Sequence, residues 1–395
     1  MDLAFTAAEL AFRDEARRFF RTEIPERIRA KLRDGENLGK EDMVASQRIL
    51  NARGWATPNW PVEWGGQDWS PVQVYLYQDE MQQAYVPSPI AFNTSMVGPV
   101  IAQFGNDEQK RRFLPRAANA DDFWCQGFSE PGSGSDLASL RTRAERKGDK
   151  YIVNGQKIWT TLAQYADWIF CLVRTDPDVK PQRGISMLLI DMKSPGVIVR
   201  PIITLDGAHE VNEVWFEDVE VPVGNRVGEE NRGWTYAKFL LGHERNNIAG
   251  IGIAKRELAR VKRVAAAELK NGRPLSADPL FAARLAEVEI DLMALAITNL
   301  RVLSADPEQG GGAEASILKI KGSEIQQTLS ELLLQAAGPY ARPFIGDALE
   351  GDLPPVGPAH SAALAAGYLN LRKLSIFGGA NEIQKNIIAQ KILGL

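Results

Sequence analysis

The sequence of 395 residues predicts an α+β multidomain protein with an N-terminal helical domain, a middle β-barrel domain and a C-terminal helical bundle. Three observations lead to this prediction. Helical patterns fill residues 1–120, short β-type runs separated by turn residues fill 121–230, and long helical patterns return over 231–395. A chain of this length is long enough for two or three domains.

The N-terminal domain opens with a helix-start signal. Thr6-Ala7-Ala8-Glu9 fits a capping box, in which the hydroxyl and the carboxylate satisfy each other's backbone N–H groups. Residues 54–71 form a loop rich in Pro, Gly and Trp, which must pack its aromatic side chains inward to offset the entropy of ordering it. Further helices are expected over 41–54, with Gly54 as the stop signal, and over 72–84 and 107–119.

The middle domain has the period-two alternation of strands. Asn154-Gly155 stands between two alternating runs and is a strong hairpin signal, so a tight turn is expected there. Further strands are expected over 167–175, 184–192, 197–202 and 211–221.

The C-terminal domain has long helical patterns. One helix is expected from Trp234 to about Leu269, with Ala and basic residues dominating its second half. Two later stripes recur at helical spacing and are expected to face the core, namely Leu280, Leu285, Val288, Leu292 and Leu295, and then Ile317, Ile320, Gln326, Leu329 and Leu333.

Composition argues against several classes of protein. The formal net charge of −4 does not fit a basic nucleic-acid surface. No apolar stretch reaches the roughly 18 residues of a membrane span, and the start has no basic and apolar leader, so a cytoplasmic location is expected. Cys125 and Cys171 are expected to be reduced and buried. The three histidines have no metal-ligand spacing, so no metal site is expected.

The segment from Cys125 to Asp136, CQGFSEPGSGSD, is the most informative part of the chain. Its glycines let backbone amides approach a ligand closely, and its hydroxyls can bond ring heteroatoms. Downstream, the string NGQKIWTT over 154–161 contains Trp159, whose ring offers a face for stacking. The two segments together predict a wall for a flat aromatic ligand with polar edges.

These two segments resemble the flavin-binding middle domain of the acyl-CoA dehydrogenases. The order of the domains also matches that family's fold, whose C-terminal domain is a four-helix bundle. The resemblance implies FAD as the cofactor, with Trp159 against one ring face. It implies FAD contacts from Gln126, Phe128, Ser129 and Thr161, and contacts with FAD or the acyl thioester from Gly134 and Ser135.

The tail from Ile376 to Gln384 resembles the family's second signature and implies FAD contacts from Gly379, Ala380 and Glu382. In many members this signature contains the Glu that is the catalytic base. Gly378 stands in that place here and has no side chain to accept a proton. The resemblance leaves it a backbone role, since the N–H at this position polarises the thioester carbonyl.

Dehydrogenation between Cα and Cβ needs a carboxylate within about 3 Å of the α-proton. Isovaleryl-CoA and long-chain acyl-CoA dehydrogenases have their base on the helix after the β domain, in a Leu-Glu-Arg string. The string LLGHER over 240–245 stands in the matching place, so Glu244 is expected to be the base. Arg245 is expected beside the substrate as a charge-balancing partner. The alternative is that Glu244 is a solvated surface charge.

Two strings with which homotetrameric members hold the pyrophosphate of a neighbour's FAD are altered. Glu268 replaces the anchoring Arg, Asn271 replaces a Phe and Pro339 replaces a Gly. Since a carboxylate repels a pyrophosphate, a heteromer with a related small subunit is expected, and the sequence most resembles the large subunit of pimeloyl-CoA dehydrogenase. The alternative is a homo-oligomer in which Lys270 or Arg273 makes the phosphate contact.

The resemblance therefore implies FAD-dependent α,β-dehydrogenation of an acyl-CoA thioester to the trans-2-enoyl-CoA, with an electron-transfer flavoprotein as acceptor. Two alternatives stay open. One is an acyl-CoA oxidase or flavin monooxygenase of the same fold, because a fold does not fix the electron acceptor. The other is a non-catalytic subunit of a heteromeric dehydrogenase.

Overall fold

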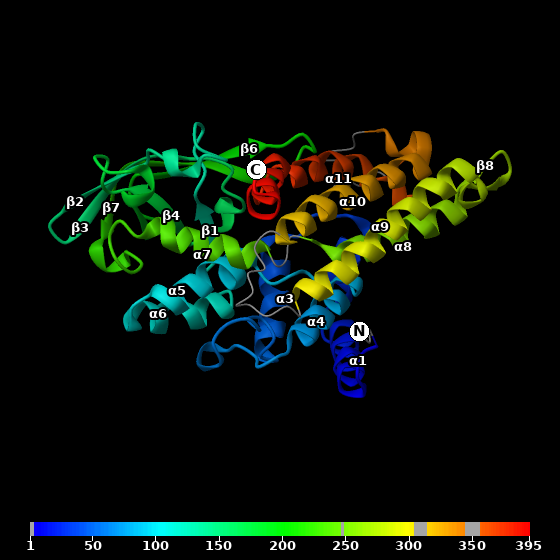
Figure 1. Ribbon diagram of the computed structural model, residues 1–395, viewed down its shortest axis with the longest axis horizontal. Coiled ribbons are helices and arrows are strands. Elements are labelled where there is room, and N and C mark those ends of the chain that lie inside the picture. Colours follow the sequence, from blue (N-terminus) through cyan, green and yellow to red (C-terminus); the bar gives the residue numbers. More distant parts are fainter. Residues whose placement is uncertain (1–3, 246–248, 304–313, 344–355) are drawn as a thin grey trace.

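The computed structural model describes residues 4–245, 249–303, 314–343 and 356–395, which form three parts (Figure 1). A curled sheet lies at one end of the long axis and a bundle of long helices at the other, with the N-terminal helices alongside both. This is the order of domains that the sequence predicts. None of the described helices is long and apolar enough to cross a membrane.

The N-terminal part contains α1 (Ala7–Thr22), α2 (Glu26–Asp34), α3 (Lys40–Ala52), α4 (Pro71–Gln83), α5 (Gly98–Phe104) and α6 (Asp107–Ala118). The capping box of α1 is confirmed, since Glu9 N donates to Thr6 Oγ1 at 3.3 Å and Thr6 N donates to Glu9 Oε2 at 2.7 Å. In the loop after α3, Trp55 and Trp60 are buried, as expected for a loop that packs its aromatic rings inward.

The middle part is a sheet of β1 (Trp124–Gly127), β2 (Arg143–Lys147), β3 (Lys150–Lys157), β4 (Trp168–Arg174), β5 (Ile185–Asp191), β6 (Val197–Ile203) and β7 (His209–Pro222). Its strand order is β1-β4-β2-β3-β7-β6, and β5 also pairs with β4. β1 runs parallel to β4, which brings the Gly/Ser-rich segment to the carboxyl end of that strand pair. Helices α5 and α6 pack against one face of this sheet. Cys125 and Cys171 are buried free thiols in the separate hydrophobic cluster that the strands form among themselves.

The tight turn expected at Asn154-Gly155 is wrong. β3 continues through both residues, and the turn that joins β2 to β3 lies at Gly148, with φ of +64°. The pairing of β3 with β7 shifts register between Val153 and Gly155, which marks a β-bulge. A side chain at Gly155 would lie 2.7 Å from Thr142 Cα, so the glycine permits a close approach between strands rather than a reversal.

The single helix expected from Trp234 to Leu269 is also wrong. The chain forms α7 (Gly233–Arg245), which packs on the sheet, and α8 (Ile251–Ala267), which belongs to the bundle. Gly250 precedes α8 with φ of +58°, a left-handed conformation that cannot continue a helix. A side chain at Gly250 would lie 2.5 Å from Gln326 Nε2, so the break coincides with close packing.

The bundle comprises α8, α9 (Pro279–Leu303), α10 (Glu314–Ala337) and α11 (Leu364–Leu371), and α12 (Asn381–Ile388) follows it. The two predicted apolar stripes face its core, with two exceptions. Leu280 is 77% exposed and Ile317 is 37% exposed, because both stand near the helix ends and outside the buried stripe. A short hairpin of β8 (Leu269–Lys270) and β9 (Arg273–Pro274) joins α8 to α9 at the far end of the bundle (Figure 1).

Candidate active site

The Gly/Ser-rich segment leaves β1 with its first residues packed and its last residues open. Gln126 is half-buried in the strand, and Phe128 is buried with its ring centroid 5.8 Å from that of Phe170. Ser129 is half-buried, and the exposed Gly134 and Ser135 follow a few residues later.

A tight turn separates these two halves. Glu130 N donates to Ser133 O at 3.0 Å, and Ser133 N donates to Glu130 O at 2.9 Å. A Cβ atom at Gly132 or Gly134 would meet no other atom within 4 Å. The turn therefore presents an open backbone surface to solvent, as the sequence predicts for a ligand wall.

Trp159 is a large aromatic side chain held outward by its backbone. It is 58% exposed, and its φ of +58° lies in the left-handed region that bulky residues rarely adopt. Ile158 N donates to Ser129 O at 2.9 Å, and Thr160 N donates to Asn212 O at 2.9 Å, so both flanking residues are fixed. A strained backbone conformation that is held in place by hydrogen bonds on both sides is common at functional sites. Thr161, which follows, is half-buried.

Contacts through Glu210 bring the tail of the chain to this wall. Leu162 N donates to Glu210 O at 2.8 Å. The carboxylate of Glu210 forms an ion pair with Lys373 and accepts a bond from Asn370 Nδ2 at 3.3 Å. Because Lys373 lies only a few residues before the tail signature, these bonds tie the segment after Trp159 to the signature.

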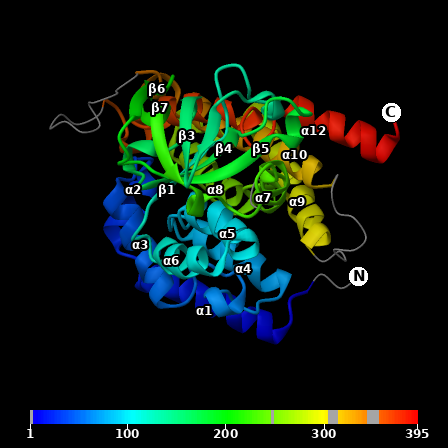
Figure 2. The same ribbon diagram turned by 90° about the vertical axis from the view of Figure 1, so that its left-hand side faces the viewer.

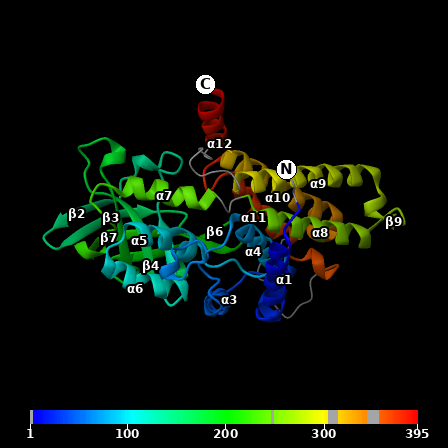
Figure 3. The same cartoon turned by 60° about the horizontal axis from the view of Figure 1, so that its bottom comes forward.

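The tail signature is an exposed glycine turn that leads into α12. Gly378 and Gly379 have φ of +63° and +88°, and Phe377 before them is exposed. Ala380 is the half-buried N-cap residue of α12, and Glu382 in its first turn is exposed. The helix then leaves the body between α7 and the bundle (Figure 3).

Helix α10 holds both the tail and the junction between α7 and α8. Asn381 Nδ2 donates to Ser323 Oγ at 3.2 Å. Next to Ser323, a side chain at Gly322 would lie 2.4 Å from Ala249 O, which shows how closely the junction packs there. The start of α8 and the first residue of α12 therefore meet on one turn of α10.

Glu244 and Arg245 lie in the last turn of α7, a few residues before Ala249. The placement of their side chains lies outside what the structure describes. Ala249, the first described residue after α7, packs closely against Gly322 of α10, next to the Ser323 that bonds the tail.

Two buried lysines at the site were not identified from the sequence. Lys157 is fully buried and forms an ion pair with Glu130 at 2.8 Å. Lys319, 1% exposed, donates to Asn381 Oδ1 at 2.8 Å, and burial lowers the pKa of its ammonium group. The signal for Lys157 was its position two residues before Trp159, on the inward face of a strand.

Comparison with known proteins assigns the family. Models of the N-terminal, middle and C-terminal domains of acyl-CoA dehydrogenases match residues 6–121, 125–219 and 231–393. The chain belongs to the acyl-CoA dehydrogenase family. It is an oxidoreductase, and members of this family depend on FAD.

Three relatives resemble this acyl-CoA dehydrogenase along nearly its full length. The acyl-CoA dehydrogenase FadE26 of Mycobacterium tuberculosis is 36% identical over 413 residues, which cover 100% of this chain and 99% of that protein. A crystal structure of the ChsE4-ChsE5 complex from the same species has a TM-score of 0.84 and 34% identity, covering 100% and 99%. The Tcur3481-Tcur3483 steroid ACAD has a TM-score of 0.86 and 30% identity, with the same coverage.

The residues of this site fit FAD. The exposed face of Trp159 suits a flat ring, and the open backbone around Gly134 suits the polar parts of a cofactor. Thr160 follows Trp159 in the chain, and its buried Oγ1 has no hydrogen-bond partner in the described part of the chain. A buried hydroxyl of this kind is satisfied when a ligand or a water supplies the missing partner.

Proposed function

We propose that this chain catalyses FAD-dependent α,β-dehydrogenation of an acyl-CoA thioester to the trans-2-enoyl-CoA, with Glu244 as the base. One arrangement carries the proposal. Ala249 and the first residue of α12 contact the same turn of α10, and the tail is bonded through Glu210 to the segment that contains Trp159. These contacts support a shared site, and the place of Glu244 in it is part of the proposal.

The chain's own residues have distinct roles in this proposal. When bound, FAD supplies the hydride acceptor. Trp159 covers one face of its ring, and Glu244 takes the α-proton from the acyl chain. The backbone N–H of Gly378 polarises the thioester carbonyl, and Arg245 balances charge beside the substrate. The remaining cofactor contacts are assigned to Gln126, Phe128, Ser129, Gly134, Ser135, Thr161, Gly379, Ala380 and Glu382, with Ser135 also reaching the substrate.

The acyl group proposed here is bulky and ring-bearing. Gly378 has no side chain, which would leave room for a bulky acyl group beside the cofactor, and one similar structure is described as a steroid ACAD. A dicarboxylic substrate, as the likeness to the large subunit of pimeloyl-CoA dehydrogenase implies, is the alternative to be tested. A panel of acyl-CoA thioesters with ring-bearing, straight and ω-carboxyl chains separates the two by their kcat/KM values.

We propose a second, related chain as partner and an electron-transfer flavoprotein as acceptor. Glu268, which replaces the phosphate-binding Arg, lies 3.0 Å from His360 Nε2, and Lys270 is paired with Asp278 at 2.6 Å. Lys270 would have to leave Asp278 to bind a neighbour's pyrophosphate, which favours a partner chain that supplies the Arg. The two similar complexes with paired names, ChsE4-ChsE5 and Tcur3481-Tcur3483, also support a heteromer.

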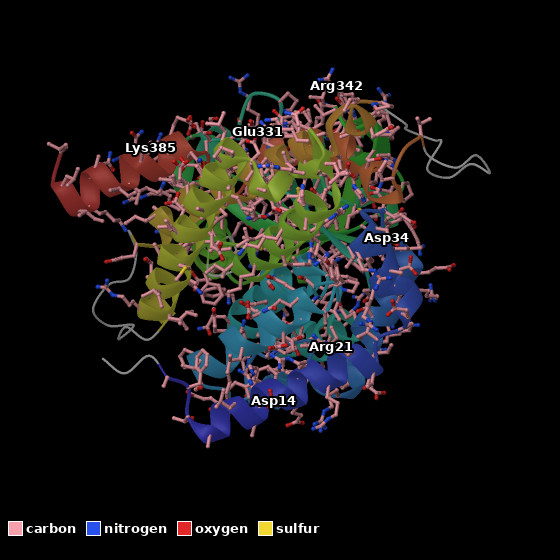
Figure 4. The ribbon with its side chains drawn as sticks, turned by 90° about the vertical axis from the view of Figure 1, so that its right-hand side faces the viewer. Asp14, Arg21, Asp34, Glu331, Arg342 and Lys385 are labelled. Carbon is pink, nitrogen blue, oxygen red and sulfur yellow. The ribbon has the colours of Figure 1, made fainter. Side chains whose placement is uncertain are left out.

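Exposed apolar residues mark where such a partner could bind. Ile290 and Met293 are exposed on one face of α9. Helix α12, which contains Lys385, projects from the body and is followed by the exposed Ile392 and Leu393 (Figures 2 and 4). Exposed apolar side chains that gather on a helix in this way are typical of interfaces.

The substitution Glu244→Gln in the purified holoenzyme tests the base. We expect kcat to fall about 10²–10⁴-fold, the usual contribution of a general base, with FAD still bound. Glu229→Gln is the matched control, because Glu229 is a strongly exposed residue just before α7 and should leave turnover unchanged. Unchanged turnover of the Glu244→Gln enzyme would place the base elsewhere or on the partner.

The fate of the electrons separates the competing activities. We expect slow reoxidation of the reduced enzyme by oxygen and fast reoxidation by an electron-transfer flavoprotein. Rapid oxygen consumption with stoichiometric peroxide would instead assign an acyl-CoA oxidase.

A further inference from the structure

A buried ion pair stands behind the wall proposed to bind FAD. Lys157, at the end of β3, is 0% exposed, and Glu130, in the Gly/Ser-rich segment, is 8% exposed. Lys157 Nζ donates to Glu130 Oε1 at 2.8 Å and to Phe128 O at 3.1 Å. The pair therefore joins the two segments of the wall from the side opposite to solvent.

The carboxylate of Glu130 also fixes the chain that follows the wall. Its oxygens accept bonds from Arg141 N at 2.6 Å and Thr142 N at 2.8 Å. Burial by itself raises the pKa of this carboxyl, but the Lys157 ammonium and these bonds outweigh it, and the pKa lies below its ordinary value. Both the ammonium and the carboxylate thus have charged and backbone partners.

The residues of this pair are close in sequence to the residues proposed to contact the cofactor. Ile158 N donates to Ser129 O at 2.9 Å, directly beside the pair. Phe128 and Ser129 precede Glu130, and Trp159 follows Lys157 by two residues. A shift of the pair would move the two sides of the wall relative to each other.

Stability alone does not explain a fully buried lysine here. The cost of desolvating a buried ion pair often equals its Coulombic gain, and apolar replacements of similar volume often fold as well. An apolar pair, however, cannot donate to Phe128 O or accept from the N–H groups of residues 141 and 142. The hydrogen bonds that an apolar pair would lose are therefore bonds that position the backbone of the wall.

We infer that Lys157 and Glu130 are positioning residues, whose ion pair holds the Gly/Ser-rich segment and the Trp159 segment at the separation that FAD requires. Neither residue needs to touch the cofactor, since Lys157 has no exposed surface. This inference rests on the proposed function, because it concerns the same wall.

The test compares variants of the holoenzyme, purified with any subunit that accompanies it. Lys157→Met and Glu130→Gln each leave one buried partner unpaired, so both should lower the melting temperature. The double variant removes both charges, yet its Gln amide oxygen can still accept from the backbone. The matched control is Lys150→Met with Glu220→Gln, which removes an exposed Lys–Glu pair of 2.6 Å from the same sheet.

We expect the double variant to recover most of the melting temperature lost by the single variants. We also expect it to bind FAD at least about tenfold more weakly, with an altered visible circular dichroism band of the bound flavin. The control should match the wild type in affinity and spectrum. A double variant with wild-type affinity and spectrum would overturn the inference.

Two further results keep the test decisive. If the double variant does not fold, Lys157→Arg serves as the test, because it keeps the positive charge but changes the length and shape of the side chain. We expect this variant to shift the spectrum of the bound flavin. A wild-type spectrum and affinity would refute the positioning role. A wild-type protein that binds no FAD would contradict the proposed function itself, whereas a variant that binds FAD normally contradicts only this inference.

Discussion

Replacing Trp159 by Gly separates the role of this residue in the fold from its role in cofactor binding. The side chain is 58% exposed, and the backbone has φ of +58°. The ring therefore contributes little burial, and the conformation is one that glycine adopts without strain. Few substitutions in a protein remove a large aromatic ring and relieve backbone strain at the same time.

The expected change in stability is small because the terms oppose each other. A Trp side chain buries at most about 250 Å², so this one buries on the order of 100 Å², which is worth roughly 2.5 kcal/mol at 25 cal/mol per Å². Relief of the left-handed conformation returns about 1–2 kcal/mol, while the flexibility of Gly in the unfolded state costs about 0.5–1 kcal/mol. The free energy of unfolding should fall by about 1–2.5 kcal/mol.

The expected change in FAD binding is larger. Stacking of an aromatic side chain on a flat ring contributes about 1–3 kcal/mol, so the Kd for FAD should rise roughly 5–150-fold. Urea unfolding of the apoprotein measures the first effect, and quenching of flavin fluorescence on titration measures the second. Trp159→Ala is the matched control, because it removes the ring but keeps a side chain in the strained conformation.

Two outcomes would refute this reasoning. A loss of more than about 4 kcal/mol in stability would mark Trp159 as a core residue, since only buried large side chains have such effects. Unchanged affinity for FAD in both variants would show that the ring does not stack on the cofactor.

Three further predictions follow from the described contacts. Gly155→Ala should lower the free energy of unfolding by about 1–3 kcal/mol, because its Cβ would lie 2.7 Å from Thr142 Cα; unchanged urea unfolding would contradict the bulge. Glu130 has a lowered pKa when folded, so its contribution to stability is complete above the ordinary carboxyl pKa and is lost as pH falls through the folded value. The acid limb of a stability profile should therefore be shallower for Glu130→Gln than for the wild type, and an identical slope would argue against the shift. Met293→Glu should dissociate the oligomer without unfolding the protomer, because Met293 is 65% exposed on α9; an unchanged mass by light scattering would place the interface elsewhere.

The two Asn-Gly pairs of this chain show what local sequence can and cannot predict. Asn271-Gly272 makes a two-residue hairpin between β8 and β9, with φ of +52° and +75°, as this dipeptide favours. Asn154-Gly155 lies inside a strand, where pairing with β7 on the other side overrides the turn preference. Whether an Asn-Gly dipeptide forms a turn therefore depends on which strands pair around it.

The break between α7 and α8 was missed for a related reason. Helical patterns stand on both sides of Gly250, and a single glycine within such a pattern is tolerated, so it gives no clear stop signal. Gly250 is left-handed at a close contact with Gln326, which lies 76 residues later in the chain, and a contact at that distance cannot be read from local sequence. The helices that were predicted well, such as α4 and α6, begin at capping boxes, which are local signals within a short stretch of sequence.

The separate motifs of the candidate site could be predicted from the sequence, but their arrangement in space could not. The Gly/Ser-rich segment, Trp159 and the tail signature are readable because their residue types are specific to a flavin wall. The links between them are Glu210 with Lys373 and Ser323 with Asn381, and these are ordinary polar pairs in sequence. Their importance comes from tertiary contacts, which no local pattern encodes.

The backbone at Gly378 bears on why the base is expected at Glu244. Many members of the family have a Glu at position 378, but here φ is +63°, where a side chain costs about 1–2 kcal/mol. Gly379 beside it is also left-handed, with φ of +88°, so two consecutive residues of this turn have a conformation that favours glycine. We therefore expect Gly378→Glu to leave the Glu244→Gln enzyme at least about 100-fold below wild type in kcat, with FAD still bound. Recovery to within about tenfold would show that the turn does accept a base, and the position of the base would then depend on which residue is present rather than on this backbone.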